Sequence, residues 1–193
     1  MVISGPSGSG KGTVLKRLDG NGDFARSISF TTRKKRDYET ENEDYFFCSE
    51  EEFHDKVHNG EFLEYATFVG NYYGTPCSYV ESEIEKGKTV VLEIDVNGAI
   101  QIKEKFPECV LVFLIPPTFA ELRRRLINRS TEPMLTVEER LNRAKEEIKL
   151  IYKYDYLVIN DDIDEAIRQI INIVEAEKLK PGRSAVQIER FKN

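Results

Sequence analysis

Gly5-Pro6-Ser7-Gly8-Ser9-Gly10-Lys11 is the stretch of this sequence that decides its fold class. It satisfies the pattern G-x-x-x-x-G-K of a phosphate-binding loop, in which glycines let successive backbone N–H groups curl around phosphate oxygens. Lys11 adds a fixed positive charge, and a helix after the loop would add the positive end of its dipole. The alternative is a glycine-rich turn that binds nothing, but Lys11 and the flanking segments favour a phosphate loop.

The segments around this loop predict an α/β fold. Residues 1–4 form a short apolar strand candidate, and residues 13–18 have helical character. Further apolar, β-rich runs lie at residues 89–94, 110–115 and 156–159. Such continuous runs are typical of parallel strands that are covered on both faces. Helical patterns lie at residues 98–105, 119–128, 137–151 and 163–179. The alternation of strands and helices predicts a central parallel sheet flanked by helices, with right-handed crossovers.

Two segments interrupt this alternation. Residues 34–80 are polar and rich in aromatic residues and glycine, which predicts short antiparallel strands around a helix at Glu50–His58. We interpret this segment as an inserted substrate-binding lobe, and residues 129–137 as a lid. The remaining segments would form the core of one domain, and residues 180–193 have no assignment. These core segments are residues 1–33, 81–128 and 138–179.

The overall charge disfavours some classes of partner. The 193-residue chain carries a formal net charge of -6. A chain of this sign is not expected to bind a nucleic acid or an anionic membrane along its surface. The basic clusters at residues 33–36 and 123–125 stand against the negative net charge, so they predict sites for a small local anion. Within the second cluster, Arg123 and Arg124 are interpreted as surface charges of their helix.

The cysteines and the apolar segments bear on the compartment. The three cysteines, Cys48, Cys77 and Cys109, are widely spaced and form no C-x-x-C pair. Such usage is typical of a reducing compartment. No apolar run approaches the roughly 20 residues of a membrane span, and the short apolar start is not a signal peptide. We therefore expect a cytoplasmic protein.

Several motifs in a fixed order point to one family. Ser27–Arg33, Arg36 and Asp44–Phe47 read S-x-S-x-T-T-R-x-x-R followed by D-Y-x-F, a pattern that resembles the guanylate kinases. Further matches follow in the same order, at Glu61–Ala66, Gly70–Thr75, Leu92–Gly98 and Val158–Asp162. The resemblance covers roughly residues 1–179. It implies a P-loop kinase with a GMP-binding lobe and a lid, which transfers the γ-phosphoryl group of ATP to GMP, or to dGMP, by direct in-line transfer with Mg²⁺.

The resemblance also implies how the acceptor GMP would be bound. Arg33 and Arg36 match arginines that grip the GMP phosphate, which suits a planar fork that pairs bidentately with phosphate oxygens. Tyr45 and Tyr73 match tyrosines whose hydroxyls donate to the same phosphate. Glu64 matches the carboxylate that reads the guanine edge, with Ser29 and Thr75 as partner hydroxyls.

The chemistry of guanine agrees with such a carboxylate. Guanine presents two neighbouring donors, N1–H and the N2 amino group, which one carboxylate accepts together. Adenine presents a lone pair at N1, which would face the carboxylate oxygens with nothing to donate. Hydroxyl groups can donate to O6 or N7 of guanine. A site whose buried polar groups are left unpaired rejects the wrong base by several kcal/mol.

On the ATP side the resemblance assigns the phosphate loop, a lid and a weaker adenine contact. Arg125, Arg129 and Arg140 match arginines that a lid lays over the ATP phosphates, where they would stabilise the transferring group. Gly12 stands where Ser or Thr is usual, so we assign no direct metal ligand and expect ATP phosphates and water to hold Mg²⁺. The residues assigned to ATP are Gly5, Ser7, Gly8, Ser9, Gly10, Lys11, Gly12, Thr13 and Asn160.

Two acidic residues and two histidines have open roles. Glu93 and Asp95 lie at i and i+2 at the end of a strand, so both are expected to point to one side, where α/β ligand sites lie. One would orient Mg²⁺-bound water and the other the guanine amino group, and the sequence does not decide which. His54 and His58 have metal-ligand spacing on a helix, but exposed helix residues are the favoured interpretation.

Three other functions compete with this one. Gly10-Lys11-Gly12-Thr13 is a spelling found in adenylate kinases, which would favour AMP, but Glu64 and the T-T-R segment favour GMP. Scaffold proteins contain guanylate-kinase-like domains that bind peptides and have lost parts of the loop, whereas Lys11 is present here. A GTP-hydrolysing switch would need an N-K-x-D motif, which the sequence lacks.

Overall fold

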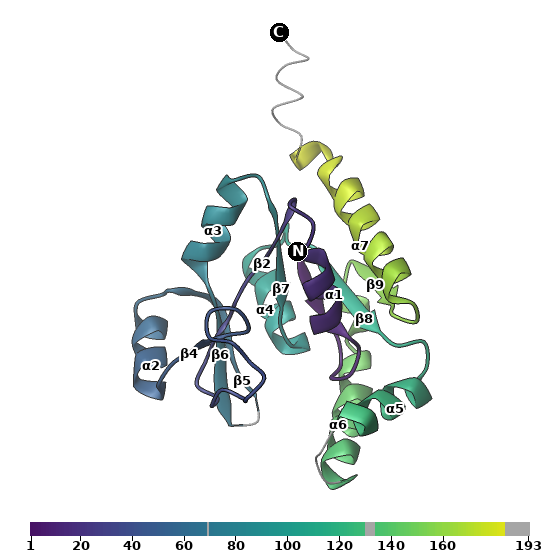
Figure 1. The fold of residues 1–193 in the computed structure, drawn as a ribbon. Coiled ribbons are helices and arrows are strands. Elements are labelled where there is room, and N and C mark those ends of the chain that lie inside the picture. The colour runs from purple at the N-terminus through teal and green to yellow at the C-terminus, as the bar shows by residue number, and fades with distance from the viewer. Residues whose placement is uncertain (69, 130–133, 184–193) are drawn as a thin grey trace.

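A large sheet of parallel strands forms the centre of the molecule (Figure 1). The computed structural model describes residues 1–68, 70–129 and 134–183. The predicted parallel sheet is confirmed, with three apolar strands at its centre, whereas the strand Phe24–Arg26 at one edge was not expected. The strands lie in the order β2 (Phe24–Arg26), β7 (Thr89–Glu93), β1 (Val2–Ser4), β8 (Leu111–Ile115) and β9 (Tyr156–Ile159).

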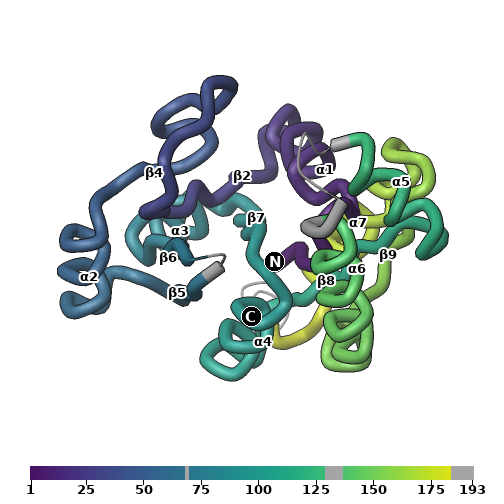
Figure 2. Tube along the Cα trace, turned by 90° about the horizontal axis from the view of Figure 1, so that it is seen from below, coloured from purple at the N-terminus to yellow at the C-terminus, as the bar shows by residue number. Residues whose placement is uncertain are grey.

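Helices cover both faces of this sheet. They are α1 (Lys11–Leu18), α3 (Cys77–Glu85), α4 (Val96–Lys105) and α7 (Ile163–Lys178). Successive strand residues point to opposite faces, so Ile3 packs with residues of α1 and α7 and Val2 packs with residues of α3 and α4. Figure 2 shows α1 and α4 on opposite sides of β7. Burial on both faces explains why these strands are apolar throughout.

The last long helix shows how the sequence directs this packing. Ala166, Ile170 and Val174 of α7 recur at helical spacing, and all are buried against the sheet. Asp162 ends the preceding loop, and its side chain accepts a hydrogen bond from the backbone N–H of Glu165. The predicted helix at residues 163–179 is confirmed, and the chain continues into a short 3-10 turn at Pro181–Arg183.

A second, smaller sheet lies to one side of the first (Figure 1). Its strands lie in the order β4 (Phe46–Phe47), β3 (Phe30–Thr31), β6 (Asn71–Pro76) and β5 (Phe62–Phe68). The β3–β6 and β5–β6 pairs are antiparallel, as expected, whereas β3 and β4 pair in parallel. This sheet begins at Phe30 and ends at Pro76, so both ends lie before the expected bounds 34 and 80. The predicted helix Glu50–His58 is confirmed as α2.

Aromatic packing holds α2 on the small sheet. Phe53 of α2 has no exposed surface, and its ring stacks on that of Phe62 with 4.8 Å between the centroids. The ring of Tyr72 stacks on Phe53 from β6, at 5.5 Å. A Cβ on Gly74 would lie only 3.0 Å from the Phe62 ring, so glycine at this position lets the ring pack closely against the strand. The small sheet therefore has an aromatic core of its own.

Helices α5 (Phe119–Arg129) and α6 (Met134–Ile148) pack together at the other side of the large sheet (Figure 1). Leu122 and Leu126 of α5 are buried with Val137, Leu141 and Ala144 of α6. Helix α6 begins earlier than the predicted start at residue 137, and a 3-10 turn at Ile151–Lys153 follows it. Most of the expected lid falls here, and its residues 130–133 lie outside the described chain. No described helix is long and apolar enough to cross a membrane.

Candidate active site

The loop between β1 and α1 requires glycine at both of its ends. Gly5 has a φ of 141° and Gly10 a φ of 94°, values that residues with side chains rarely adopt. A Cβ on Gly5 would lie 2.2 Å from the carbonyl oxygen of Leu114, and one on Gly10 would lie 2.3 Å from Nδ2 of Asn160. The loop therefore lies tightly against the end of β8 and the residue that follows β9.

Lys11 is the first residue of α1, and its side chain folds back across the loop. Its Nζ donates hydrogen bonds to the carbonyl oxygens of Gly5 at 2.7 Å and Pro6 at 3.1 Å. The ammonium group thus lies beside the loop, near the positive end of the α1 dipole. The buried hydroxyl of Ser9 has no hydrogen-bond partner in the part of the chain that the structure describes. Both features are those of a site built to receive an anion.

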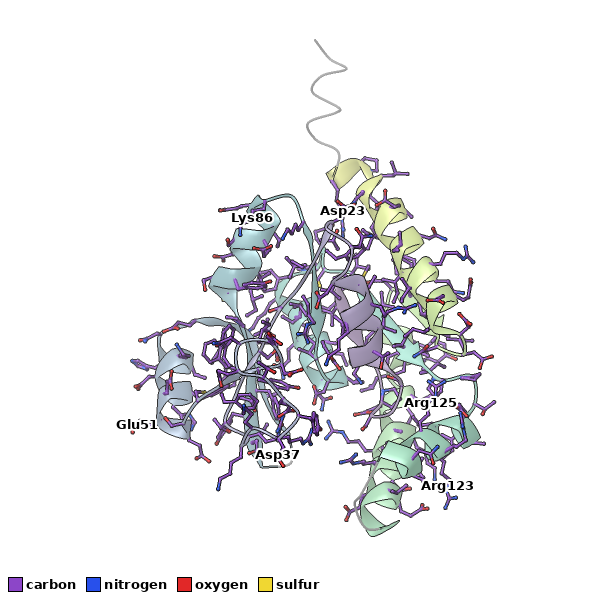
Figure 3. The ribbon with its side chains drawn as sticks, viewed as in Figure 1. Asp23, Asp37, Glu51, Lys86, Arg123 and Arg125 are labelled. Atoms are coloured by element: carbon purple, nitrogen blue, oxygen red, sulfur yellow. The ribbon has the colours of Figure 1, made fainter. Side chains whose placement is uncertain are left out.

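Asn160 contacts this loop directly, and Arg125 contacts Asn160. The buried Asn160 side chain donates from Nδ2 to the carbonyl oxygen of Ser9 at 2.8 Å. Arg125 donates from Nη2 to the carbonyl oxygen of Asn160 at 2.9 Å and from Nε to Glu121 at 2.7 Å. A Cβ on Gly10 would lie 3.9 Å from Nη1 of Arg125, so the guanidinium lies at the edge of the loop. Figure 3 shows Arg125 and Arg123 on the same helix, α5.

Glu93 and Asp95 diverge, contrary to the expectation that both point to one side of a strand. Strand β7 ends at Glu93, and a Cβ on Gly12 would lie 3.6 Å from Oε2 of that residue, so Glu93 faces the start of α1. Asp95 instead caps α4, where its Oδ1 accepts the backbone N–H of Gly98 at 2.8 Å. The two carboxylates therefore serve different parts of the site.

Glu64 is a buried carboxylate between the small sheet and the start of α4. It lies on β5 opposite Thr75 of β6, next to an irregularity in the strand register, and its side chain is only 3% exposed. Oγ1 of Thr75 donates to Oε1 of Glu64 at 2.6 Å. Oε2 lies 3.0 Å from the place a Cβ would take on Gly98, so the glycine at the start of α4 makes room for this carboxylate.

Burial raises the pKa of Glu64 to about 7. Its hydrogen bond from Thr75 lowers this pKa, and the negative charge of Asp95 raises it further. Near neutral pH the group therefore lies close to the balance between its neutral and ionised forms. A ligand that donates hydrogen bonds to both carboxylate oxygens would favour the ionised form.

A cationic cluster occupies the other end of the small sheet. Arg33 donates a bidentate pair of hydrogen bonds to Glu39, at 3.0 Å from Nη1 to Oε2 and at 2.6 Å from Nη2 to Oε1. Glu39 is buried and also accepts the backbone N–H of Arg36 at 2.9 Å. Burial lowers the pKa of Arg33, but the contacts with Glu39 outweigh this effect and raise it. Arg36 is about half-exposed, and its Nη1 donates to the hydroxyl of Tyr38 at 3.1 Å.

Two tyrosines complete this cluster. The guanidinium of Arg33 lies over the ring of Tyr45, 5.4 Å from its centroid. The rings of Tyr45 and Tyr73 pack edge to face, with 5.9 Å between their centroids. Burial raises the pKa of Tyr45 to about 12, and the negative charge of Glu93 adds to this effect. Tyr45 therefore keeps its proton as a hydrogen-bond donor.

For the remaining predicted site residues, the structure gives a position in the fold. Ser29 is half-buried between β2 and β3, and its carbonyl oxygen accepts the backbone N–H of Phe46 at 3.0 Å. Arg140 is half-buried on α6, and Thr13 is exposed on α1. Arg129 is the last residue of α5, and its side chain lies outside the described part. None of these positions conflicts with the predicted roles, and none tests them.

Sequence reasoning missed two charged residues of the site. Glu39 follows the basic run at residues 33–36, but Asp37 and Glu41 lie on either side of it, so no local pattern singles out the carboxylate that pairs with Arg33. Arg143 of α6 donates from Nη2 to Oδ2 of Asp95 at 3.0 Å, a contact between residues far apart in the sequence. Only the tertiary structure reveals that pair.

Within the described residues, neither His54 nor His58 belongs to a cluster of possible metal ligands. His54 packs its ring against that of Tyr72, with 5.0 Å between the centroids. Among the described residues no group of three or more His, Cys, Asp and Glu side chains could hold a metal ion. The cysteines Cys48, Cys77 and Cys109 are free thiols.

Comparison with known proteins identifies this arrangement. The family model described as guanylate kinase matches residues 1–177. The chain is 47% identical to the guanylate kinase of Lactococcus lactis over 192 residues, which cover 99% of this chain and 92% of that protein. It is 50% identical to the guanylate kinase of Bacillus anthracis over 187 residues, which cover 96% and 91%.

A solved structure supports the same relationship. The guanylate kinase of Anaplasma phagocytophilum superimposes with a TM-score of 0.77 at 37% identity, over 94% of this chain and 87% of that one. Both the sequence motifs that line the phosphate loop and those on the small sheet lie within the matched region. The chain belongs to the guanylate kinase family.

Proposed function

We propose that this protein transfers the γ-phosphoryl group of ATP to GMP, giving ADP and GDP. The observation that carries this proposal is the buried carboxylate of Glu64, which accepts a hydrogen bond from Thr75 on the small sheet, outside the phosphate loop. A kinase acting on a nucleoside monophosphate needs one site for the donor phosphates and another that reads the acceptor base. The two regions supply chemistry for both.

Glu64 would select guanine. Its two oxygens would accept N1–H and the N2 amino group, while the Thr75 hydroxyl, and that of Ser29, would donate to acceptor atoms of the base. Adenine would leave this buried carboxylate facing a lone pair. The loss of hydrogen bonds by a buried polar group makes that choice unfavourable by several kcal/mol.

The cluster of Arg33, Arg36, Tyr45 and Tyr73 would hold the GMP phosphate. In the ligand-free protein Glu39 holds Arg33 in place through two hydrogen bonds, so the guanidinium is oriented before a phosphate arrives. A bidentate arginine and a protonated tyrosine are strong donors to phosphate oxygens. The acceptor phosphate would then lie between the small sheet and Glu93, whose charge reaches Tyr45.

The donor phosphates would lie on the loop and the start of α1. The residues proposed there are Gly5, Ser7, Gly8, Ser9, Gly10, Lys11, Gly12 and Thr13. Lys11 would exchange its contacts with the carbonyls of Gly5 and Pro6 for contacts with phosphate oxygens. We assign Asn160 as a brace of the loop beside the adenine. Arg125, Arg129 and Arg140 would approach the transferring group, whose charge is spread over its oxygens.

The acidic end of β7 fits Mg²⁺ bound with ATP. Gly12 leaves open the space in front of the Glu93 carboxylate, and carboxylate oxygens and water are the ligands that Mg²⁺ prefers. We propose that Glu93 accepts hydrogen bonds from water on the ion, while ATP phosphates bind the ion directly. When bound, the ion would neutralise charge on the phosphates. Asp95 would accept from the guanine amino group.

The reaction would proceed in line and without a phosphoenzyme. An oxygen of the GMP phosphate is already anionic, so it needs little help from a general base. Positioning and charge neutralisation by Lys11 and the arginines would supply most of the rate enhancement. Exclusion of water would prevent loss of ATP by hydrolysis, so we propose that the small sheet and the α5–α6 segment close on the substrates. The free thiols of Cys48, Cys77 and Cys109 suit the cytoplasm as the place of action.

The test is ADP production from MgATP with GMP, dGMP, AMP, CMP, UMP or dTMP as the acceptor. We expect rapid turnover with GMP and little with AMP. Turnover with AMP in place of GMP would mean that the base site is wrongly assigned, although the fold stands. A folded protein without turnover of any acceptor would contradict catalysis and favour a binding domain.

A further inference from the structure

An ion pair ties helix α6 to the base end of the acceptor site. Nη2 of Arg143 donates to Oδ2 of Asp95 at 3.0 Å, and Nε donates to Oε1 of Glu147 at 2.7 Å. The side chains of Arg143 and Asp95 are 39% and 24% exposed, so the pair is partly shielded from water. Arg143 is therefore oriented by a residue of its own helix while it reaches a residue of another element.

Asp95 is held from two sides. Its Oδ1 accepts the backbone N–H of Gly98 at 2.8 Å, and its Oδ2 accepts from Arg143. A carboxylate that is bound through both oxygens to different elements cannot rotate without losing a hydrogen bond. Gly98 is also the residue beside Glu64, since a Cβ there would lie 3.0 Å from Oε2 of Glu64 and 3.4 Å from Oδ1 of Asp95. Arg143 thus binds Asp95, whose carboxylate lies close to that of Glu64 on either side of Gly98.

The neighbouring carboxylates of Glu64 and Asp95 repel each other when both are ionised, so a nearby cation stabilises them. Glu64 and Asp95 are close enough for the negative charge of Asp95 to oppose the ionisation of Glu64. The positive charge of Lys105, at the end of α4, lowers the pKa of Glu64 and so favours its ionised form. The guanidinium of Arg143 on Asp95 adds a second positive charge on the α6 side, which offsets the repulsion between the two carboxylates.

Helix geometry explains why Arg143 points toward α4. Val137, Leu141 and Ala144 form the stripe of α6 that packs on α5. Arg143 and Glu147 lie four residues apart on an adjacent face, so they meet each other, while Nη2 of Arg143 reaches Asp95. The direction of Arg143 follows from the register of α6 rather than from a chance surface contact.

We propose that Arg143 is a positioning residue, which holds Asp95 in the orientation that receives the guanine amino group. This inference rests on the proposed function. Since Arg143 acts on the base end and not on the phosphate loop, its loss should weaken the use of GMP and leave the use of ATP unchanged. The effect should be of the size expected for one partly exposed ion pair.

The test compares steady-state kinetics of Arg143→Gln and Arg143→Lys with the parent protein. We expect Arg143→Gln to raise the KM for GMP about fivefold, with the kcat and the KM for ATP nearly unchanged. Arg143→Lys keeps the charge and should recover much of the loss. The matched control is Arg123→Gln, which removes an exposed arginine of α5 (Figure 3). Arg123 pairs with Glu138 of α6 at 3.2 Å, so this control also breaks an ion pair to α6. It should leave both KM values unchanged.

A double-mutant cycle with Asp95→Asn separates positioning from a general structural role. Once Asp95 has lost its charge, Arg143→Gln should add little to the KM for GMP, so the two effects should not add. Additive effects, or an Arg143→Gln protein with the parent KM for GMP, would overturn the inference. A parent protein that does not phosphorylate GMP would instead overturn the proposed function, so the two failures are distinguishable.

Discussion

The phosphate loop and the small sheet hold their polar groups by different means. The loop is shaped by backbone: Gly5 and Gly10 lie against Leu114 and Asn160 at distances that no side chain at either glycine would permit. The small sheet is shaped by pairs of side chains, Arg33 with Glu39 and Glu64 with Thr75. The loop is suited to the phosphates that all nucleotides share, and so is Arg33, whereas a buried pair such as Glu64 and Thr75 can distinguish one base from another.

This difference leads to the largest expected effect, which is at Lys11. We expect Lys11→Ala to lower kcat on the order of a thousandfold for every acceptor, because the loop loses the only side-chain cation of its motif. Initial rates with saturating GMP and ATP measure this effect. Lys16→Ala removes an exposed lysine of the same helix and serves as the control. Equal losses in the two variants would contradict the role of Lys11.

Breaking the other region should change the choice of acceptor rather than all turnover. We expect Glu64→Gln to lower kcat/KM for GMP more than a hundredfold, because an amide group would turn a donor toward the guanine donors. The KM for ATP should stay near its parent value. Glu61→Gln, which alters an exposed carboxylate next to the same strand, should have little effect on either substrate. A parent-like Glu64→Gln enzyme would refute the assignment of the base site.

The pH dependence of GMP binding sharpens the same comparison. The pKa of Glu64 is raised to about 7, chiefly by burial, and only the ionised form accepts both guanine donors. We expect the KM for GMP to rise by about tenfold for each pH unit below that pKa and to level off above it. The phosphate of GMP titrates too, so the profile of Glu64→Gln is the reference. A constant ratio between the two profiles from pH 5.5 to 8.5 would count against Glu64 as the titrating group.

A smaller effect is expected at Glu39, which orients Arg33 without a proposed contact to the substrate. Glu39→Gln keeps the shape but removes the charge that holds the guanidinium. We expect the KM for GMP to rise about tenfold and the free energy of unfolding to fall by about 1–2 kcal/mol, since Arg33 loses its partner in a half-buried place. Kinetics and thermal unfolding measure the two effects. Glu41→Gln provides a nearby exposed control, and an unchanged KM would argue against the orienting role.

The two regions also differ in how far the sequence predicts them. The glycines of the loop and the continuous apolar runs of β7, β1 and β8 carry local signals, and the parallel sheet is confirmed. Strands β3 and β4 have only two residues each and depend on pairing with neighbouring strands, so no local sequence pattern predicts them. The expected start of the lobe at residue 34 therefore lies after β3.

The site shows the same limit. The roles of Glu64 and Thr75 rest on the resemblance of their motifs and stay predictions. The roles of Glu93 and Asp95 could not be separated, because the sequence does not show that β7 ends at Glu93. Asp95 with Gly98 three residues later carried the signal of a helix cap. Arg143 lay on a helix face with many charges, and only the packing of α6 on α5 directs it to Asp95.

The central claim is that the small sheet reads guanine, and the binding of nucleoside monophosphates without ATP tests it most directly. A ligand that binds only the folded protein raises the melting temperature, and at the same concentration a tighter ligand raises it further. At pH 8 we predict that GMP raises the melting temperature of the parent protein clearly more than AMP at the same concentration, and that Glu64→Gln abolishes this difference. Equal stabilisation of the parent protein by GMP and AMP would contradict the account.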